Sequence, residues 1–126
     1  MTDPKSLIID YLRALSGKPK TPAVVREYVS DERLAQHIAD VEAAFPQYEI
    51  VAEDILADGN KIVLRGEFRG IHRGAFAGLE PTSKSVSAGL IIIYAISDGR
   101  IVDHWMQFDL FTLMQQLQAS AAGQTA

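Results

Sequence analysis

Residues 48–69 read YEIVAEDILADGNKIVLRGEFR, and this stretch decides the fold class. Two runs with the two-residue period of a β-strand, 48–57 and 61–69, flank the turn DGN at 58–60. An Asp-Gly pair between such runs is a strong signal for a β-hairpin. In the second run, isoleucine, leucine and phenylalanine alternate with arginine and glutamate, so one face is expected in a core and the other in contact with water.

Two more strands are expected after this hairpin. Residues 86–96 form a long apolar run, and Asp98-Gly99 turns it into a second run at 100–108. Between the two hairpins, residues 70–84 (GIHRGAFAGLEPTSK) are glycine-rich, which predicts a loop of functional length or a short excursion at the edge of the sheet. A last helix is predicted at 111–117.

Three helices are expected before the hairpin. Asp3-Pro4 and Thr21-Pro22 each combine a capping residue with a proline suited to the first turn. Ser30-Asp31 opens the third helix, and Pro46 closes it. Helices followed by consecutive strands indicate an α+β fold. We expect a curved antiparallel sheet, a cone or half-barrel, packed against the N-terminal helices and enclosing an apolar pocket.

The composition narrows the class of protein. With 126 residues, 48% of them hydrophobic, the chain has enough material for one core, so residues 1–118 are expected as a single domain and 119–126 as a flexible tail. A net charge of -4 and the lack of a basic stripe argue against a nucleic-acid partner. The absence of cysteine excludes disulfides and thiolate chemistry. We find no signal core and no apolar run long enough to span a membrane, so a cytoplasmic protein is the default expectation.

The stretch DHWMQFDLF, residues 103–111, has polar and aromatic residues that alternate between the two faces of the predicted strand. The question is which of these faces lines the interior of the protein. One face carries Asp103, Trp105, Gln107 and Asp109, and the other carries His104, Met106 and Phe108. We expect the Trp105 face to line a cavity. The His104 face would then be apolar and exposed, and burial in a homodimer explains it more simply than a catalytic histidine.

Several segments together resemble the SnoaL-like polyketide cyclase, or ester cyclase, family of the nuclear-transport-factor-2-like superfamily. The resemblance rests on VEAAFPQYEIVAEDILADGNKIVLRGEF, on FRGIHRGAFAGLEPTSKSV and on DGRIVDHWMQFDLFTLMQQL, and it covers residues 30 to 118. Three positions depart from the family pattern: Ser83 replaces a glycine, Ile71 a threonine, and Ala95 a frequent arginine.

The resemblance implies a curved sheet with three helices around a deep apolar pocket, usually in a dimer. In cyclases of this family an aspartate in the pocket serves as acid and base for an intramolecular aldol closure, without metal or cofactor. The matching position of the W-x-x-x-D motif is Asp109, beside Trp105.

The residues around Asp109 also make it a candidate catalytic base. It lies between Phe108 and Leu110, where loss of hydration would raise the pKa of its carboxyl and suit it to abstract a proton next to a carbonyl. The alternative is an N-cap of the last helix, because an aspartate directly precedes LFTLMQQL. On the same face, Trp105 is a candidate pocket wall and Gln107 a candidate donor to a carbonyl, with core packing and a solvated amide as the alternatives.

The remaining candidates for substrate binding are His72, His37 and Tyr11. His72 lies in the glycine-rich loop and His37 on the third helix, and each has a structural hydrogen-bonding role as its alternative. Tyr11, Tyr28 and Tyr48 offer hydroxyls that either bind a ligand or pack in the core. No metal site is expected, because the three histidines are far apart in sequence and lack ligand spacing.

Three functional hypotheses follow. The first is an enzyme without cofactor that uses acid–base chemistry on a small hydrophobic carbonyl compound, by aldol cyclisation or isomerisation, with Asp109 as base. The second is a binding module that uses the same pocket without turnover. The third is a dimerising scaffold with a filled interior.

Overall fold

The computed structural model describes residues 3–118, so the predicted tail at 119–126 lies outside the described residues. Three helices, α1 (Pro4–Leu15), α2 (Pro22–Tyr28) and α3 (Glu32–Ala44), precede four strands. The strands are β1 (Glu49–Asp58), β2 (Lys61–Ile71), β3 (Ser85–Ser97) and β4 (Arg100–Phe108), and α4 (Leu110–Gln118) follows them. The predicted α+β class and the antiparallel sheet are confirmed.

The helices begin where the capping signals predicted. Side chains of Asp3, Thr21 and Asp31 accept hydrogen bonds from backbone N–H groups in the first turn of α1, α2 and α3. Pro4 and Pro22 occupy the first positions of α1 and α2, where the N–H that proline lacks would have no partner within the helix. None of the described helices is long and apolar enough to cross a membrane.

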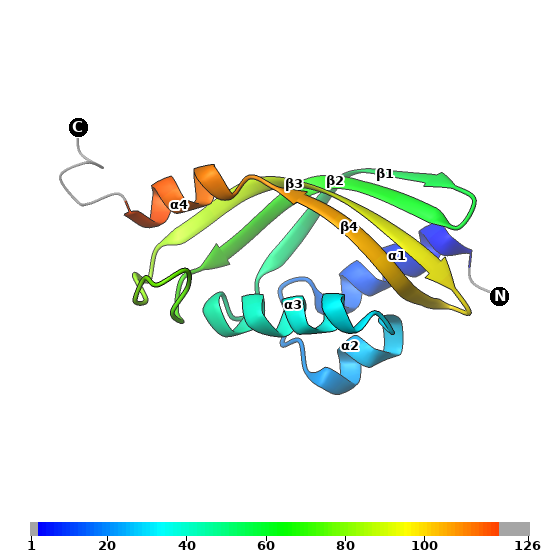
Figure 1. Cartoon of the computed structure of the whole chain (residues 1–126), viewed down its shortest axis with the longest axis horizontal. Helices are drawn as coiled ribbons and strands as arrows, with labels where there is room; N and C mark the ends of the chain where they lie inside the picture. Colours follow the sequence, from blue (N-terminus) through cyan, green and yellow to red (C-terminus); the bar gives the residue numbers. More distant parts are fainter. Residues whose placement is uncertain (1–2, 119–126) are drawn as a thin grey trace.

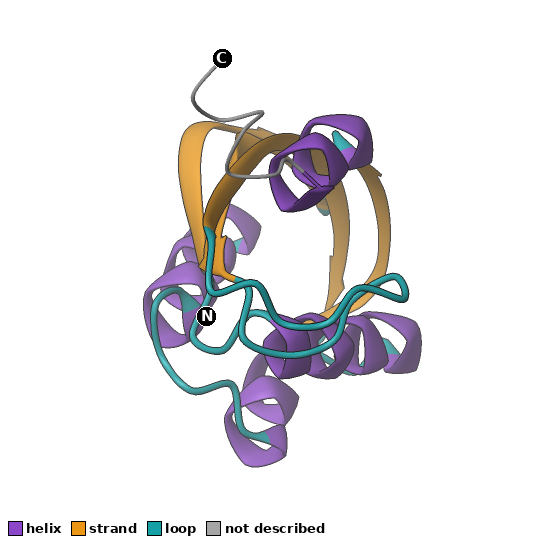
Figure 2. Ribbon diagram, turned by 90° about the vertical axis from the view of Figure 1, so that its left-hand side faces the viewer, coloured by secondary structure: helices purple, strands orange, loops and turns teal. Residues whose placement is uncertain are grey.

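The sheet is a meander in the order β1-β2-β3-β4, with every neighbouring pair antiparallel. It arches over α1, α2 and α3, which cover its concave side, while α4 lies at the opposite end of the molecule from the two hairpin turns (Figure 1). Viewed from the end that carries α4, the strands are seen to curl, with helices beneath them (Figure 2). Glu53 is an extra residue in β1 between the pairs Ala52–Gly66 and Asp54–Arg65, and such a bulge increases the local bend.

Both edges of the sheet are tied to the helical layer. At the β4 edge, the backbone N–H groups of Ser30 and Asp31 donate to the Ile101 carbonyl over 3.0 and 3.1 Å. At the β1 end, the Ser16 hydroxyl accepts from Ile50 N–H at 2.9 Å, and Gly17 N–H donates to the Tyr48 carbonyl at 3.0 Å. The helices are therefore fixed beneath the arch at both sides.

The two faces of the sheet are reversed relative to our expectation. Met106 and Phe108 pack against the core under the arch, whereas Trp105 is 50% exposed on the convex side. Alternation correctly predicted which residues share a face, but it cannot tell which face the helices will cover. The His104 face is thus the inner one, which removes the reason for assigning it to a dimer contact.

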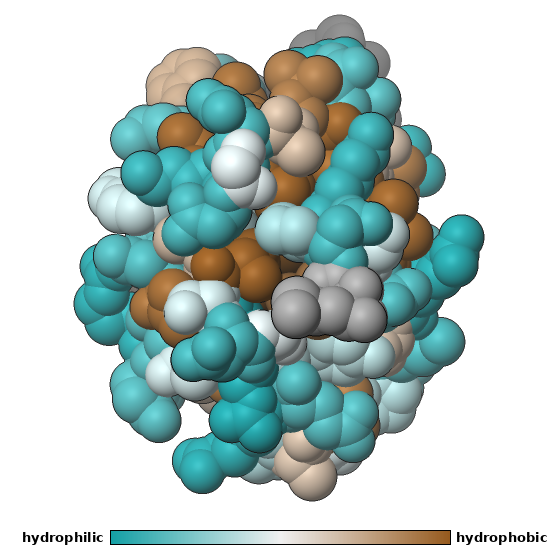
Figure 3. All heavy atoms as spheres, turned by 90° about the vertical axis from the view of Figure 1, so that its right-hand side faces the viewer, coloured by the Kyte–Doolittle hydropathy of each residue, from teal (hydrophilic) through white to brown (hydrophobic). Residues whose placement is uncertain are grey.

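The convex face carries an apolar row that crosses all four strands. Direct cross-strand pairs link Leu56 to Val63, Val63 to Ile93, and Ile93 to Trp105. Leu56 and Trp105 are exposed, and Lys61 places its ammonium 5.9 Å from the centre of the Trp105 ring. Figure 3 shows another side of the molecule, the end where both hairpins turn, where apolar side chains lie among polar ones.

Gly66 pairs with Ala52 next to the β1 bulge, and it provides a test of how closely β1 and β2 pack. A Cβ at Gly66 would collide with the Val51 carbonyl oxygen, which is backbone and cannot move aside easily. We expect Gly66→Ala to lower the free energy of unfolding by about 1–3 kcal/mol, as overpacking typically does, measured by urea denaturation. Gly89→Ala is the matched control on the next strand, because its Cβ would meet only the Gly66 carbonyl oxygen at 4.0 Å. Equal stability of the two variants would contradict the packing described here.

The candidate functional site is a cavity under the sheet

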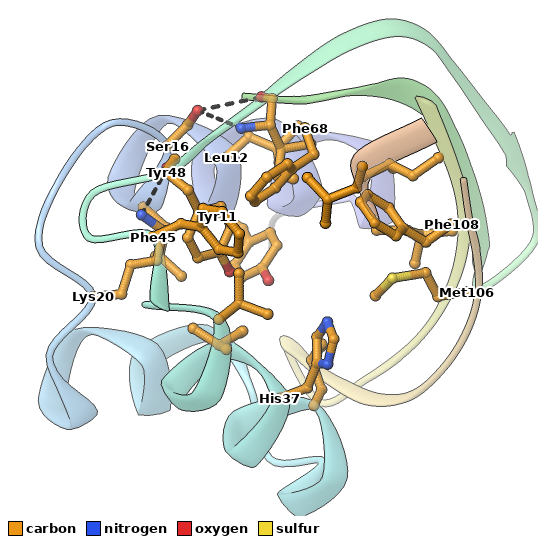
Figure 4. Close-up of a pocket in the computed structure, with 18 of the residues that line it drawn as sticks. Tyr11, Leu12, Ser16, Lys20, His37, Phe45, Tyr48, Phe68, Met106 and Phe108 are labelled. Atoms are coloured by element: carbon orange, nitrogen blue, oxygen red, sulfur yellow. Dashed lines mark hydrogen bonds between the residues drawn. The ribbon is translucent and has the colours of Figure 1, made fainter. Parts of the chain in front are cut away.

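A cavity of about 350 Å³ lies between the concave face of the sheet and the helices. Figure 4 shows side chains from α1, α3, β1 and the strands beyond it converging on this space. The wall is mainly aliphatic and aromatic, and its apolar members include Leu12, Leu15, Leu34, Ile38, Val41, Phe45, Ile50, Phe68, Phe76, Leu90, Ile92, Met106, Phe108 and Leu113. The expected apolar pocket is therefore present, although with a different set of strand residues in its wall.

Polar side chains in the wall are few. They are Tyr11, Ser16, Lys20, His37, Tyr48 and Tyr94. Two of the wall residues, His37 and Leu110, are themselves exposed to solvent, so the cavity is open where they stand. Of our candidate binding residues, the structure brings Tyr11 and His37 together in this cavity.

Tyr11 and Tyr94 form a hydroxyl pair inside the cavity. Their rings meet edge to face with centroids 5.8 Å apart, and both side chains belong to the wall. Burial raises the pKa of both tyrosines above the ordinary value, so both hydroxyls keep their protons at neutral pH. A protonated hydroxyl can donate a hydrogen bond, so this pair is a source of donors for a ligand.

Lys20 contributes a cation to the wall, but its three N–H donors are already used. Its ammonium donates to the backbone carbonyls of Lys18 at 2.9 Å and Tyr48 at 2.8 Å, and lies 3.3 Å from a carboxylate oxygen of Glu42. Burial lowers the pKa of Lys20, and the Glu42 charge opposes that shift. Lys20 therefore neutralises Glu42 and closes the end of the cavity, and it does not offer a free cation to an anionic ligand.

His37 projects from α3 into the space bordered by Tyr11 and Met106 (Figure 4). Loss of hydration lowers the pKa of its imidazole, and the charge of nearby His104 acts in the same direction, while Asp40 opposes them. Its side chain still meets solvent at the opening. The imidazole is therefore uncharged at neutral pH and has a nitrogen lone pair with which to accept a proton.

Asp109 is not in the cavity wall, which corrects our prediction for the base. It is exposed and caps α4: its carboxylate accepts from the Thr112 N–H at 3.1 Å and from the Thr112 hydroxyl at 2.6 Å. These hydrogen bonds hold the pKa of Asp109 below its ordinary value, opposite to the rise that a buried base would show. The alternative that we considered, an N-cap of the last helix, describes its position.

Trp105 and Gln107 are not in the cavity wall either. Both side chains are exposed on the convex face, because they alternate with the inward-facing Met106 and Phe108. Trp105 as a pocket wall and Gln107 as a donor to a carbonyl are therefore not part of this cavity.

His72 is completely buried, yet it also lies outside the cavity wall. Its Nδ1 accepts a hydrogen bond from the Thr82 N–H at 3.2 Å, and its ring packs against Phe45 with centroids 5.4 Å apart. Backbone bonds from His72 to Lys84 and Ser83 close the same loop. Since Nδ1 accepts, the proton of a neutral ring sits on Nε2, which has no hydrogen-bond partner among the described residues. His72 thus anchors the 72–84 loop, whose Phe76 does reach the cavity.

Sequence reasoning missed Tyr94, Ser16 and Lys20. Tyr94 was detectable, because it alternates in register with Leu90 and Ile92 along a strand whose inner face is apolar. Ser16 and Lys20 follow a helix end, where sequence patterns do not predict the path of the chain.

One further cluster lies between α3 and β4. Among the described residues, Asp31, Asp103 and His104 bring potential metal-ligand atoms within 4.8 Å of one another. These atoms are bonded to one another or to Arg33: His104 Nδ1 lies 2.7 Å from Asp31 Oδ2, and Arg33 forms an ion pair with Asp103 at 2.6 Å. The side chains of the cluster are therefore engaged with one another.

Many solved structures have the same fold as this chain. The chain superimposes on a protein of Acidithiobacillus ferrooxidans proposed to be a polyketide cyclase, with a TM-score of 0.81, 17% identity and coverage of 95% of this chain and 97% of that one. It is similar to AclR of Streptomyces galilaeus, proposed to be a hydroxylase, with a TM-score of 0.79, 21% identity and coverage of 94% and 82%. IdmH of Streptomyces antibioticus, proposed to be a polyketide cyclase, gives a TM-score of 0.74, 22% identity and coverage of 92% and 99%. At these identities the likeness shows the fold.

No sequence among curated proteins matches the chain. The model of one protein family does match, over residues 17–117, which includes every strand and most residues of the cavity wall. On that evidence the chain belongs to the SnoaL-like polyketide cyclase family.

Proposed function

We propose that the cavity binds a small, uncharged, hydrophobic carbonyl compound and catalyses a proton transfer next to its carbonyl, leading to isomerisation or intramolecular aldol closure. The observation that carries this proposal is the position of His37. Of the described residues in the wall, it is the one whose ordinary pKa lies near neutrality, and loss of hydration lowers that pKa, while the hydroxyls of Tyr11 and Tyr94 belong to the same wall. A base and a proton donor thus face the same apolar space.

The character of the wall supports an uncharged ligand. Most of the surface is aliphatic or aromatic, which stabilises a hydrophobic ligand in proportion to the area that leaves water. A carboxylate or phosphate would need a free cation, and Lys20 is already bound to Glu42 and two carbonyls. The names of similar proteins, which include polyketide cyclases, are compatible with a ligand of this class.

In the proposed reaction, the His37 imidazole takes the proton from the carbon next to the carbonyl and becomes an imidazolium. The electron pair of the broken C–H bond moves to the carbonyl oxygen, giving an enolate that a protonated hydroxyl of Tyr11 or Tyr94 stabilises by hydrogen bonding. The enolate carbon then either takes a proton back, which completes an isomerisation, or attacks a second carbonyl of the same molecule, which forms the new C–C bond of an aldol. In the second case the proton on His37 passes to the new alkoxide.

A second candidate function is the storage or transport of such a compound without turnover. The cavity wall near β4 favours it, because Met106 and Phe108 supply only apolar contacts there. The two functions share the ligand and differ in what His37 does.

Substitution in the cavity separates these functions. We would screen hydrophobic ketones, ketoesters and aromatic carbonyl compounds for a rise in melting temperature, and then assay the compounds that bind for exchange or conversion. His37→Gln is expected to lower turnover about 10²–10⁴-fold, the usual contribution of a general base, with little change in affinity. Tyr11→Phe should reduce turnover while preserving the ring contacts.

Asp109→Asn is the matched control, because it removes a carboxylate outside the cavity and asparagine also caps helices well. Loss of turnover in Asp109→Asn with full activity in His37→Gln would overturn the assignment of the base. Binding without conversion in every variant would favour storage, and the lack of any binding compound would contradict both functions.

The stability of the protein should also depend on pH through His37. Because the pKa of His37 is lowered from its ordinary 6.5, the unfolded chain binds more protons than the folded one just below pH 6.5. The free energy of unfolding is therefore expected to rise with pH through this window and to level off above it. His37→Gln should weaken this rise, measured by urea denaturation between pH 5 and 8. An identical pH dependence in wild type and His37→Gln would mean that the imidazole is not desolvated.

We also propose that the protein forms a homodimer, through the convex face and not through the His104 face. The row Leu56, Val63, Ile93 and Trp105 presents apolar surface across the whole sheet. Next to it stand side chains of both charges, such as Arg65 and Glu67, so a second copy of the same face offers opposite charges as well as apolar area.

The dimer can be tested with Trp105, the single tryptophan of the chain. Dimerisation should bury its indole, so its emission should shift to longer wavelength on dilution, in step with a fall in mass by analytical ultracentrifugation. Ile91→Lys is expected to give a monomer with an unchanged circular dichroism spectrum, because Ile91 is exposed on the same face. A wild-type protein that stays monomeric at high concentration would contradict the dimer.

A further inference from the structure

Tyr48 is a polar member of the cavity wall that the proposed reaction does not use. It lies between the end of α3 and the start of β1, and only 7% of its surface is exposed. Burial raises the pKa of its phenol, so the hydroxyl keeps its proton at neutral pH. Phenylalanine would pack in the same place without a polar atom, so the hydroxyl needs an explanation.

The backbone of Tyr48 is held by three hydrogen bonds. Its N–H donates to the Phe45 carbonyl at 3.1 Å, and its carbonyl accepts from the Gly17 N–H at 3.0 Å. The same carbonyl accepts from the Lys20 ammonium at 2.8 Å, a bond that a dashed line marks in Figure 4. Tyr48 therefore cannot shift without the loss of hydrogen bonds from two neighbouring segments.

The ring of Tyr48 is held as well. The Lys20 ammonium lies 4.1 Å from the centre of the ring, which is a cation–π distance, and the Phe68 ring lies with its centroid 5.4 Å away. Glu42 keeps the ammonium in place, because a carboxylate oxygen lies 3.3 Å from it. The direction of the phenol is thus set before any ligand enters, so a bond to its hydroxyl requires little ordering of the side chain.

The hydroxyl of Tyr48 is free to bond to a ligand. Within residues 3–118, His72 Nε2 is the one fully buried side-chain nitrogen or oxygen without a hydrogen-bond partner. The Tyr48 hydroxyl has no such partner in this part of the chain either, so its oxygen is not fully buried and meets open space. The open space that Tyr48 lines is the cavity, to which the hydroxyl can donate its proton.

Tyr48 and His37 lie at different ends of this cavity. Lys20 closes the end beside Tyr48, whereas His37 stands at the opening. Figure 4 shows Tyr48 and Lys20 on one side of the space and His37 on the other. A ligand whose reacting carbon meets His37, with its carbonyl oxygen bound by Tyr11 or Tyr94, would extend from the opening toward Tyr48.

We propose that Tyr48 is a specificity-determining residue that donates a hydrogen bond to a second oxygen of the ligand at the closed end of the cavity. The preferred substrate is then a carbonyl compound with another carbonyl or hydroxyl oxygen on the far part of its apolar skeleton. An analogue without that oxygen would leave a buried donor unpaired, which weakens its binding. This subsite rests on the proposed ligand class, but it does not depend on turnover.

Bicyclic ketones test the subsite. The probes are α-tetralone, which has a single oxygen, and its derivatives with one hydroxyl at successive positions of the second ring. Calorimetry would give dissociation constants for wild type, Tyr48→Phe and the matched control Tyr28→Phe, whose tyrosine contacts the Tyr11 ring from outside the wall. At least one hydroxytetralone should bind wild type more tightly than α-tetralone does. Tyr48→Phe should remove that advantage, about 2–10-fold for one hydrogen bond, and leave the affinity for α-tetralone unchanged.

The outcomes separate the subsite from the reaction. Equal weakening of α-tetralone and its derivatives in Tyr48→Phe, or an advantage that survives the substitution, would overturn the subsite and leave the proposed reaction intact. Binding with the expected pattern but without turnover would preserve the subsite and reject catalysis. A wild type that binds none of the tetralones would overturn the subsite together with the ligand class.

Urea denaturation without ligand gives a second test. Because the Tyr48 hydroxyl has no protein partner in residues 3–118, the midpoint of Tyr48→Phe should equal or exceed that of wild type. A lower midpoint would mean that the hydroxyl is bonded within the protein, which would overturn its role as a donor to the ligand.

Discussion

The cavity depends on hydrogen bonds that tie the helical layer to both edges of a curved sheet. The Ile101 carbonyl in β4 holds the start of α3, and Ser16 and Gly17 hold the end of α1 to the start of β1. The arch of the sheet, increased by the bulge at Glu53, is then too deep for the helices to fill. Side chains from both layers meet around a space instead of interdigitating across it.

This arrangement concentrates a few polar groups in apolar surroundings. Two protonated tyrosines meet edge to face, a lysine is neutralised by a glutamate, and an imidazole stands at the opening. In such a setting, electrostatic interactions are stronger than in water, so a charge on one side chain affects its neighbours. The role that we propose for His37 follows from this property of the cavity and not from an unusual residue.

Much of the fold was predictable from local signals. Capping residues with prolines located the helix starts, and Asp58-Gly59 and Asp98-Gly99 located both hairpin turns.

The site was less predictable. Alternation separated Trp105 and Gln107 from Met106 and Phe108 correctly, but the choice between the faces depends on where the helices pack, which is a property of the tertiary structure. For Asp109, the helix-capping signal and the family motif coincided on one residue, and the hydrogen bonds to Thr112 favour the cap. Ser83, which replaces a family glycine, has a φ of 59°, so the backbone retains the turn that glycine favours.

The anchoring of the 72–84 loop by His72 has a consequence for access to the interior. Its Nε2–H is buried without a partner among the described residues, and an unsatisfied buried donor typically costs about 1–3 kcal/mol. Movement of this loop away from the sheet would let water bond to that N–H, so part of the free energy needed to open the loop is recovered at once. Phe76 would leave the cavity wall in the same movement. The histidine that anchors this loop therefore also reduces the free-energy cost of moving the loop away from the sheet.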